Sequence, residues 1–210
     1  MFMYTRRNNV KIILASGSPR RKELMSQFTQ KYNLNYEIIA SEADEERLKH
    51  TIKIPGELVE KLSYIKAQEI FKKVKNEYKD VVVIGADTIV FLNGKVMGKP
   101  KNQEDAVNML CEIQGKVNEV YTGLTIIIKR GSEIKYEICH SVIKVYMKPM
   151  TEIDILEYIA TKEPMDKAGA YAIQGIGGRY IEKYEGDFNT AVGLNIVELE
   201  RLFVENKLFN

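Results

Sequence analysis

Residues 10–24, VKIILASGSPRRKEL, join a short apolar run to a polar turn and then to a helical pattern. An apolar run of this length that ends at a turn is typical of a buried strand. Ser18 is a suitable helix N-cap, and Pro19 suits the first helical position, where a backbone N–H would lack a partner anyway. The stretch therefore predicts a strand, a Ser-Gly-Ser loop and a helix in direct succession.

Arg20 and Arg21 fall in the first turn of that predicted helix. Free backbone N–H groups and the positive end of the helix dipole favour a phosphate there, and two guanidinium groups add donors that match phosphate oxygens. An exposed basic helix start is the alternative, but it would place two cations at the unfavourable end of the dipole. We interpret the stretch as an anion site, although it lacks the spacing of a Walker A loop.

Outward from this stretch, strands and helices are mixed, with no repeat and no low-complexity linker. Residues 81–100 predict a strand, a turn and a second strand, and then a tight hairpin turn at Asn93-Gly94. The other expected elements are a strand at 36–40, helices at 57–73, 103–113, 151–160 and 196–205, and two long antiparallel strands around Arg130-Gly131-Ser132. The mixture predicts one α/β domain over residues 1–210, built around a mixed sheet.

The composition limits the classes of function. The formal net charge is +2, from 31 basic and 29 acidic residues, whereas nucleic-acid-binding proteins usually carry a strong basic excess. No segment is long and apolar enough for a signal peptide or a membrane span. Cys111 and Cys139 match no metal spacing and stand among apolar residues, so we expect two buried thiols rather than a disulfide. We expect a cytoplasmic protein with no membrane or nucleic-acid partner.

Carboxylates and one unusual lysine are the first candidates for chemistry. Asp87 stands in IGADTIV at the end of the most apolar strand, where aspartate is depleted. It either binds magnesium or activates a water, or it is a turn residue bonded to its own backbone. Asp44 and Glu45, in SEADEE, are either further magnesium ligands or part of a solvated loop. Lys66 falls within the apolar stripe of the helix at 57–73, so it either reaches water along the helix or has a function.

Two later stretches add polar groups. Lys99, in GKP, follows the predicted hairpin and can neutralise a phosphate. A polar, glycine-rich loop precedes the last helix, and long loops within a compact domain are usually functional. In it, Gln174 offers both a donor and an acceptor to a base edge, unless it is simply an exposed amide. His50 and His140 have no partner pattern, and we expect both to be structural.

Together these stretches resemble the Maf family, the septum-formation-inhibitor-like nucleotide pyrophosphatases. The matching blocks, in chain order, are LASGSPRRKEL, SEADEE, LSYIKA, GADTIV, GKP, VYTG, DKAGAYAIQG and GDFNTAVGL. One block alone is weak, but eight in order are specific. The resemblance implies an elongated α/β fold with a mixed sheet, two lobes and a central cleft, similar to the inosine-triphosphate pyrophosphatases. It also implies a homodimer.

The resemblance further implies hydrolysis of a nucleoside triphosphate between its α and β phosphates, with a divalent cation, expected to be Mg²⁺. By motif, Asp87 is the catalytic proton acceptor, and Arg20, Thr88 and Gln174 are associated with substrate choice. The polar residues expected to line the cleft are Ser16, Arg21, Glu45, Lys66 and Lys99. Glu45 and Asp87 are the candidate metal ligands, and Lys66 would then point at phosphate.

GADT and IQG match the dTTP/UTP pyrophosphatase branch of the family. The branch that acts on N7-methylguanosine triphosphate tends to have glutamine after the aspartate and glutamate in place of the later glutamine. We therefore predict dTTP and UTP as substrates, with modified pyrimidine nucleotides as further candidates. Asn118 and Asn195 depart from the common family histidine and proline, but neither is a catalytic candidate.

Two other classes of function are open. The chain is alternatively a nucleotide-binding regulator of septum formation and cell division with little catalysis. The retained Asp87 and Glu45 argue against this, because a pure binder gains little from carboxylates near phosphates. An RNA-binding module that uses arginines and tyrosines is the third class, and the balanced charge argues against it.

Overall fold

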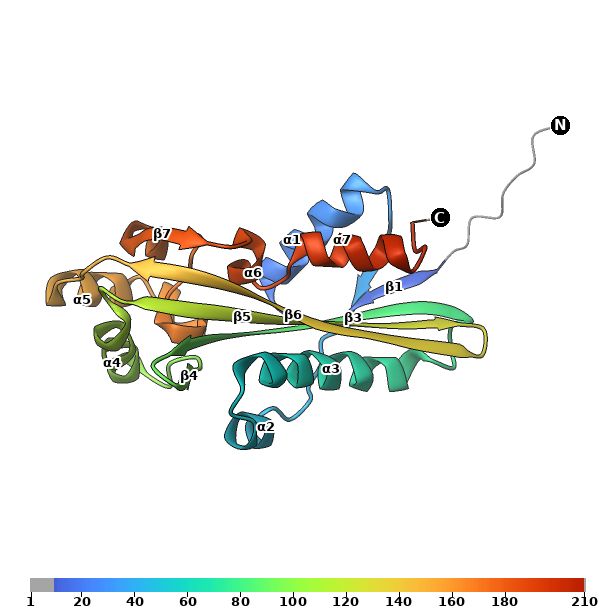
Figure 1. Ribbon diagram of the computed structural model, residues 1–210, viewed down its shortest axis with the longest axis horizontal. Helices are drawn as coiled ribbons and strands as arrows, with labels where there is room; N and C mark the ends of the chain where they lie inside the picture. Colours follow the sequence, from blue (N-terminus) through green and yellow to red (C-terminus); the bar gives the residue numbers. More distant parts are fainter. Residues whose placement is uncertain (1–9, 210) are drawn as a thin grey trace.

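A seven-stranded mixed sheet forms the centre of the computed structural model, which describes residues 10–209 (Figure 1). The order is β2-β1-β3-β5-β6-β7, and β4 pairs with β3. The strands are β1 (Lys11–Leu14), β2 (Tyr36–Ile38), β3 (Asp80–Leu92), β4 (Lys95–Met97), β5 (Val117–Arg130), β6 (Glu133–Met147) and β7 (Ile181–Glu185). β1 is parallel to both neighbours, and the other pairs are antiparallel. The predicted α/β class with a mixed sheet is confirmed.

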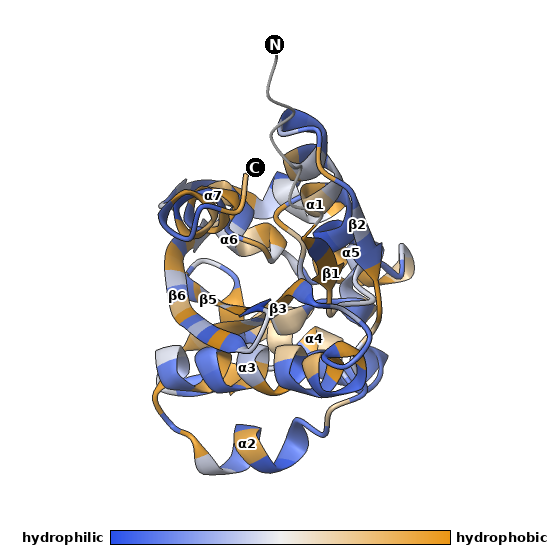
Figure 2. Cartoon of the chain, turned by 90° about the vertical axis from the view of Figure 1, so that its right-hand side faces the viewer, coloured by the Kyte–Doolittle hydropathy of each residue, from blue (hydrophilic) through white to orange (hydrophobic). Residues whose placement is uncertain are grey.

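Helices cover both faces of the sheet. They are α1 (Pro19–Lys31), α2 (Glu46–Thr51), α3 (Pro55–Val74), α4 (Gln103–Ile113), α5 (Glu152–Ala160), α6 (Phe188–Val192) and α7 (Ile196–Glu205), with short 3₁₀ helices η1 (Glu163–Asp166), η2 (Ala168–Ala170) and η3 (Ile176–Tyr180). Figure 2 shows α3 on one side of the long strands and α1 and α7 on the other. The α1 and α7 side chains share one apolar cluster with β1, β3 and β5, while α3 packs against β1 and β3 on the opposite face.

β3 is continuous where the sequence predicted a turn. It runs from Asp80 to Leu92, and Asp87 lies within it, opposite Gly123 of β5, so the predicted turn was wrong. Gly85, within this strand, allows a close approach of α3, because a Cβ on Gly85 would overlap the Ser63 carbonyl oxygen of that helix. Residues two apart on a strand share a face. Asp87 therefore points to the side of the sheet that α3 covers.

The predicted helices and strands otherwise form, with their boundaries moved by a few residues. Asn93 and Gly94 both adopt positive φ in the β3–β4 hairpin, and Thr151 caps α5 in a capping box. The segment between α5 and α7, predicted as a loop, also contains β7 and α6. α2 begins at Glu46, the last residue of the acidic cluster SEADEE, and no helix was predicted there. No helix within residues 10–209 is long and apolar enough to cross a membrane.

The expectation of two buried thiols was wrong. Both cysteines are free, but Cys111 is exposed and Cys139 is half-buried. Cys111 lies on the solvent side of α4, whose buried residues are Ala106, Leu110 and Ile113. The apolar neighbours of Cys111 in sequence point to the core, whereas Cys111 itself lies on the opposite face of the helix.

Candidate active site

A cavity of about 770 Å³ opens beside a stretch of β3 that lacks a strand partner on one edge. β1 pairs with β3 only as far as Ile84, and β4 pairs with it from Val90 onward. Within the described chain, residues 85–89 therefore have a free edge between two partners. Asp87 and Thr88 lie in this gap and point to opposite faces of the sheet, yet both line the cavity because β1 has already ended.

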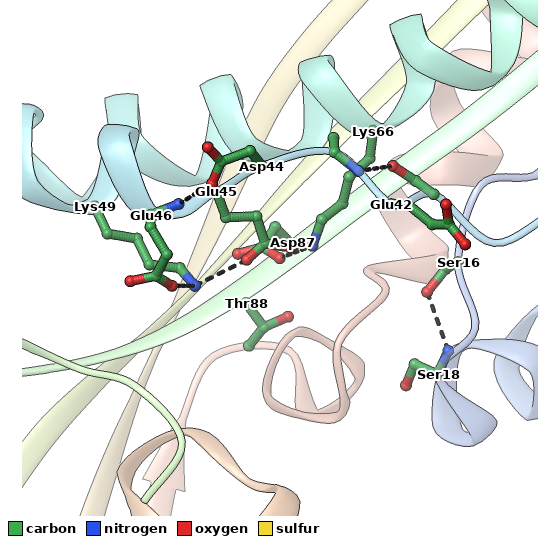
Figure 3. Close-up of polar contacts among 12 residues, drawn as sticks. Ser16, Ser18, Glu42, Asp44, Glu45, Glu46, Lys49, Lys66, Asp87 and Thr88 are labelled. Carbon is green, nitrogen blue, oxygen red and sulfur yellow. Dashed lines mark hydrogen bonds and ion pairs between the residues drawn. The ribbon is translucent and has the colours of Figure 1, made fainter. Parts of the chain in front are cut away.

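The Lys66 ammonium lies between two carboxylates. It forms an ion pair with Glu45, at 2.6 Å from Oε1, and a second with Asp87 Oδ1 (Figure 3). The Lys66 and Asp87 side chains are only 12% and 10% exposed. The lysine in the apolar stripe of α3 therefore does not extend to bulk water, and its charge is balanced at the site.

Glu45 receives a second lysine. It stands immediately before α2, and Lys49 of that helix approaches Glu45 Oε2 at 2.9 Å. Burial acts to raise the pKa of Glu45, but the charges and hydrogen bonds of Lys66 and Lys49 outweigh it and lower the pKa. Glu45 is therefore an anion at neutral pH. The spacing of four residues between Glu45 and Lys49 is a signal that sequence reasoning could have used.

Arg21 connects three segments of the chain. Its Nε donates to the Gly193 carbonyl at 2.8 Å, and one terminal nitrogen donates to Thr88 Oγ1 at 3.1 Å. The other terminal nitrogen donates to Ser16 Oγ at 3.4 Å. Burial lowers the pKa of Arg21, and nearby Asp87 opposes that change, so the guanidinium stays charged at neutral pH. Arg21 lines the cavity, and its hydrogen bonds hold together the three segments that surround it.

Ser16 is buried and accepts a hydrogen bond from Arg21, but its side chain does not line the cavity. Its hydroxyl oxygen also accepts the backbone N–H of Ser18 at 3.3 Å. The Ser18 side chain makes no capping hydrogen bond, so the predicted cap was wrong in its detail, although α1 does begin at Pro19. Ser16 shapes the β1–α1 loop that the sequence assigned to an anion.

Thr88 belongs to a chain of hydroxyl groups with a defined direction. Thr122 Oγ1 donates to the Thr190 carbonyl at 2.7 Å, which uses its only proton. The 2.8 Å contact between Thr88 and Thr122 must then carry the Thr88 proton. Thr88 Oγ1 also accepts a hydrogen bond from Arg21. The Thr88 hydroxyl therefore has one lone pair left with which to accept a hydrogen bond from a ligand. Thr88 is thus oriented as an acceptor.

Arg20, Lys99 and Gln174 also line the cavity. Within residues 10–209 their side chains make no hydrogen bond or ion pair with the protein, so their polar ends are available to a ligand. Sequence reasoning missed several other lining residues, among them Lys49, Lys101, Asp166, Lys167 and His50. Asp166 and Lys167 form an ion pair and stand in or beside the DKAGAYAIQG block.

The cavity carries more positive than negative charge. Seven basic and five acidic residues of the described chain line it: Arg20, Arg21, Lys49, Lys66, Lys99, Lys101 and Lys167, with Glu45, Glu46, Asp87, Asp105 and Asp166. Such a lining suits a polyanion. Residues 10–209 hold no cluster of three or more metal-ligating side chains. The nearest arrangement is Glu45 and Asp87, two carboxylates that already share one cation, Lys66.

Comparison with known proteins shows which protein family this chain matches. The family described as "Maf-like protein" matches residues 11–206. A dTTP/UTP pyrophosphatase of Thermoanaerobacter sp. (strain X514) is 46% identical over 191 residues, which cover 90% of this chain and 93% of that protein. Two further dTTP/UTP pyrophosphatases are similar: that of Lachnoclostridium phytofermentans is 43% identical over 94% of both chains, and that of Clostridium novyi (strain NT) is 41% identical over 92% of this chain and 96% of its own.

Proposed function

This chain belongs to the Maf-like protein family, and from that membership we propose that it is a dTTP/UTP pyrophosphatase. It hydrolyses a pyrimidine nucleoside triphosphate between the α and β phosphates and releases the monophosphate and pyrophosphate. The observation that carries the proposal is a buried carboxylate, Asp87, at the free edge of β3, in a cavity with an excess of cationic side chains. Modified pyrimidine nucleotides are further candidate substrates.

The cationic side chains hold the triphosphate. Arg20 and Lys99 form no ion pair within the described residues, and Arg21 and Lys66 stand beside them in the lining. As the bond to the leaving pyrophosphate breaks, negative charge grows on its oxygens. Fixed positive charges stabilise that change without reorganising, and phosphoryl transfer depends mainly on such positioning and electrostatics.

Asp87 accepts the proton of the attacking water. Lys66 contacts its Oδ1 and holds the carboxylate in place. No donor within residues 10–209 hydrogen-bonds to Oδ2, so this oxygen remains to accept a proton. A general base must be ionised and within hydrogen-bond reach of the water that it activates. Lys66 supplies the neighbouring positive charge, and the strand position of Asp87 aims it into the cavity.

Glu45 and Asp87 fit a divalent cation of the magnesium type. Mg²⁺ is usually bound by one or two carboxylates together with substrate phosphates, rather than by a cage of protein ligands. These two carboxylates both contact the same ammonium group, which is how two ligands of one cation are arranged. When bound, such a cation neutralises charge on the phosphates beside it.

Gln174 and Thr88 select the base. A uracil or thymine edge presents carbonyl acceptors around one N–H donor, and an amide side chain offers both complementary groups. Thr88 contributes the lone pair left by its hydroxyl chain. We further propose two lobes on either side of this cavity and a homodimer, both of which rest on the family resemblance alone, and a cytoplasmic location.

Pyrophosphate release tests the activity. With magnesium, wild-type protein should turn over dTTP and UTP in preference to CTP, GTP and N7-methylguanosine triphosphate. Replacement of Asp87 by Asn should lower the turnover rate by about 10²- to 10⁴-fold, the usual contribution of a general base. The substitution also removes one of the two carboxylate partners of Lys66, so thermal unfolding is measured alongside to show that the variant stays folded. The matched control is Asp80→Asn, at the far end of β3, where the amide oxygen can still accept the Gly131 N–H.

Three results would contradict parts of this proposal. A near-normal rate in D87N would remove Asp87 as the base. Turnover of N7-methylguanosine triphosphate in place of the pyrimidine nucleotides would keep the enzyme and reject the substrate class. No turnover of any nucleotide by the wild type would leave the nucleotide-binding regulator as the better explanation.

A further inference from the structure

The loop that carries Gln174 is attached at both ends to one pair of side chains. Before Gln174, the backbone N–H of Ala172 donates to the Tyr158 hydroxyl at 3.1 Å. That hydroxyl donates in turn to Glu163 Oε2 at 2.8 Å. The chain therefore enters the loop held by Tyr158 of α5, which is itself fixed by Glu163 at the start of η1.

After Gln174, the backbone returns to the same glutamate. The N–H of Gly177 donates to Glu163 Oε2 at 2.8 Å, and the N–H of Ile176 donates to Oε1 at 3.0 Å. One carboxylate thus accepts three hydrogen bonds, which is close to its capacity. We refer to Tyr158 and Glu163, with these four hydrogen bonds, as the Tyr158–Glu163 clamp.

Two glycines show how closely the loop lies on the clamp. Gly175 has a φ of +85°, a conformation that favours glycine. A Cβ there would overlap Glu163 Oε1, and a Cβ on Gly177 would overlap the Tyr158 hydroxyl. The backbone that follows Gln174 is therefore in direct contact with both clamp side chains, which leave no room for a side chain at Gly175 or Gly177.

Both clamp residues are held in the protonation states that these hydrogen bonds need. Tyr158 is 1% exposed, and burial raises its pKa, so its proton stays available for Glu163. Burial also acts to raise the pKa of Glu163, but the hydrogen bonds from Tyr158, Gly177 and Ile176 outweigh it and lower the pKa. At neutral pH the clamp is a neutral phenol bonded to a carboxylate anion.

We propose that Tyr158 and Glu163 are positioning residues that set the choice of base by holding Gln174 at the cavity. This inference rests on the proposed function, because it assigns Gln174 to the base. The Gln174 side chain has no hydrogen bond to the protein within residues 10–209, so its direction depends on the backbone that carries it. Displacements of about 1 Å in a positioned group are enough to reduce an enzyme's efficiency strongly.

Glu163→Gln is the sharpest variant. Glutamine has the same shape, but only one of its two terminal atoms accepts hydrogen bonds, so three donors face one acceptor and an N–H₂ group. We expect the KM for UTP to rise about tenfold, the size of effect that a lost buried hydrogen bond produces. We expect kcat to change by less than about threefold, because Asp87 and Lys66 lie on other elements. The preference for UTP over CTP should fall by about tenfold as well.

The matched control is Glu157→Gln. Glu157 is exposed on α5, one residue before Tyr158, and makes no hydrogen bond within the described chain. The Glu157→Gln substitution removes the same charge from the same region of the protein, and it should leave KM, kcat and the base preference unchanged. If E163Q does not fold, Tyr158→Phe replaces it, because it loses only the hydroxyl group. It should shift KM in the same direction by a smaller factor.

Amide hydrogen exchange separates the clamp from the activity. In E163Q the amides of Ile176 and Gly177 should exchange faster than in wild type, and in E157Q they should not. Unchanged exchange would overturn the clamp, whether or not the protein is active. Faster exchange with an unchanged KM and base preference would overturn its role in specificity. A wild type that turns over no nucleotide would instead overturn the proposed function on which that role rests.

Discussion

Lys66 is the side chain on which the charge balance of the site depends. Its ammonium contacts Glu45, which is half-buried, and Asp87, which is buried. Removal of one member of such a group leaves an uncompensated charge, which costs more than the group contributes as a whole. The apolar stripe of α3 predicted that Lys66 faces inward. The positions of the three residues in the sequence do not by themselves show that Glu45 and Asp87 contact Lys66.

The hydroxyl chain makes a prediction at the same scale. Thr122→Val removes the donor to the Thr190 carbonyl and the acceptor of the Thr88 proton. The buried Thr190 carbonyl and the half-buried Thr88 hydroxyl lose their partners, so we expect the free energy of unfolding to fall by about 1–3 kcal/mol. The KM for UTP should also rise, because Thr88 is no longer held as an acceptor. Urea unfolding and steady-state kinetics measure both effects.

Thr122→Ser is the matched variant for that test, since it keeps the hydroxyl group and should retain most of the stability and the KM. If Thr122→Val behaved like wild type in both measurements, the direction assigned to the chain would be wrong.

At the scale of elements, two glycines decide how α3 meets the sheet. A Cβ on Gly85 of β3 would overlap the Ser63 carbonyl, and one on Gly123 of β5 would overlap the Val59 carbonyl. The helix backbone therefore lies directly on adjacent strands, which brings Lys66 within reach of Asp87. Sequence reasoning placed a turn in this part of residues 81–100, although an isolated glycine within a strand pattern indicates a bulge or a close backbone approach. The competing cause, a close backbone approach, depends on a helix that is distant in sequence.

Gly85→Ala tests this packing. The added methyl group meets helix backbone rather than a flexible side chain, so the helix must move. We expect the free energy of unfolding to fall by about 1–3 kcal/mol, as for other overpacked sites, and the turnover of UTP to fall as Lys66 shifts. The control is Gly98→Ala, where a Cβ meets nothing within 4 Å. Equal stabilities of the two variants in urea would reject the close approach as a constraint.

Helices with a clear period were predictable, whereas short elements were not. α4 and α7 bury one side and expose the other, and Thr151 marks the start of α5 with its own side chain. By contrast, α2 spans only Glu46–Thr51 and buries none of its residues, so no apolar period marks it. β7 pairs with the end of β6 and is mostly exposed. Such short elements are stabilised by contacts with neighbouring parts of the fold, so their own sequence predicts them only weakly.

At the scale of the whole molecule, the cavity exists because neighbouring strands have unequal lengths. β1 has four residues and β3 has thirteen. β3 therefore extends past the end of its parallel partner before β4 begins to pair with it. The helix that follows β1 brings Arg20 and Arg21 to the same gap. Ligand sites at the carboxyl ends of parallel strands arise for this reason.

Acid stability is a prediction for the whole chain, because carboxyl groups throughout it have lowered pKa values. They are Glu45, Glu69, Glu137, Asp154, Glu163, Asp166, Glu185, Glu198 and Glu200. A carboxyl group whose pKa is lower in the folded state stabilises the fold above its ordinary pKa. That stability is lost as the pH falls from the ordinary value, 4.5 for glutamate, through the folded one.

We therefore expect the free energy of unfolding in urea to fall between about pH 5 and pH 3. Part of the fall should be absent in Glu163→Gln, which has no carboxyl group to protonate at the clamp, and fully present in Glu157→Gln. A free energy of unfolding that stays constant over that range would contradict the expectation.

The sequence by itself determined the local events: the start of α1 at Pro19, the capped start of α5, the Asn93-Gly94 hairpin and the inward direction of Lys66. Each depends on residues within a few positions of one another, so a linear pattern is enough. Only the tertiary structure decided that β3 passes through Asp87 without a turn, that its edge is open there, and that Tyr158 and Glu163 hold the Gln174 loop. These outcomes depend on pairing and packing between residues that are distant in the chain. They also depend on hydrogen bonds from backbone N–H groups, and the type of a residue does not predict which acceptor its N–H group finds.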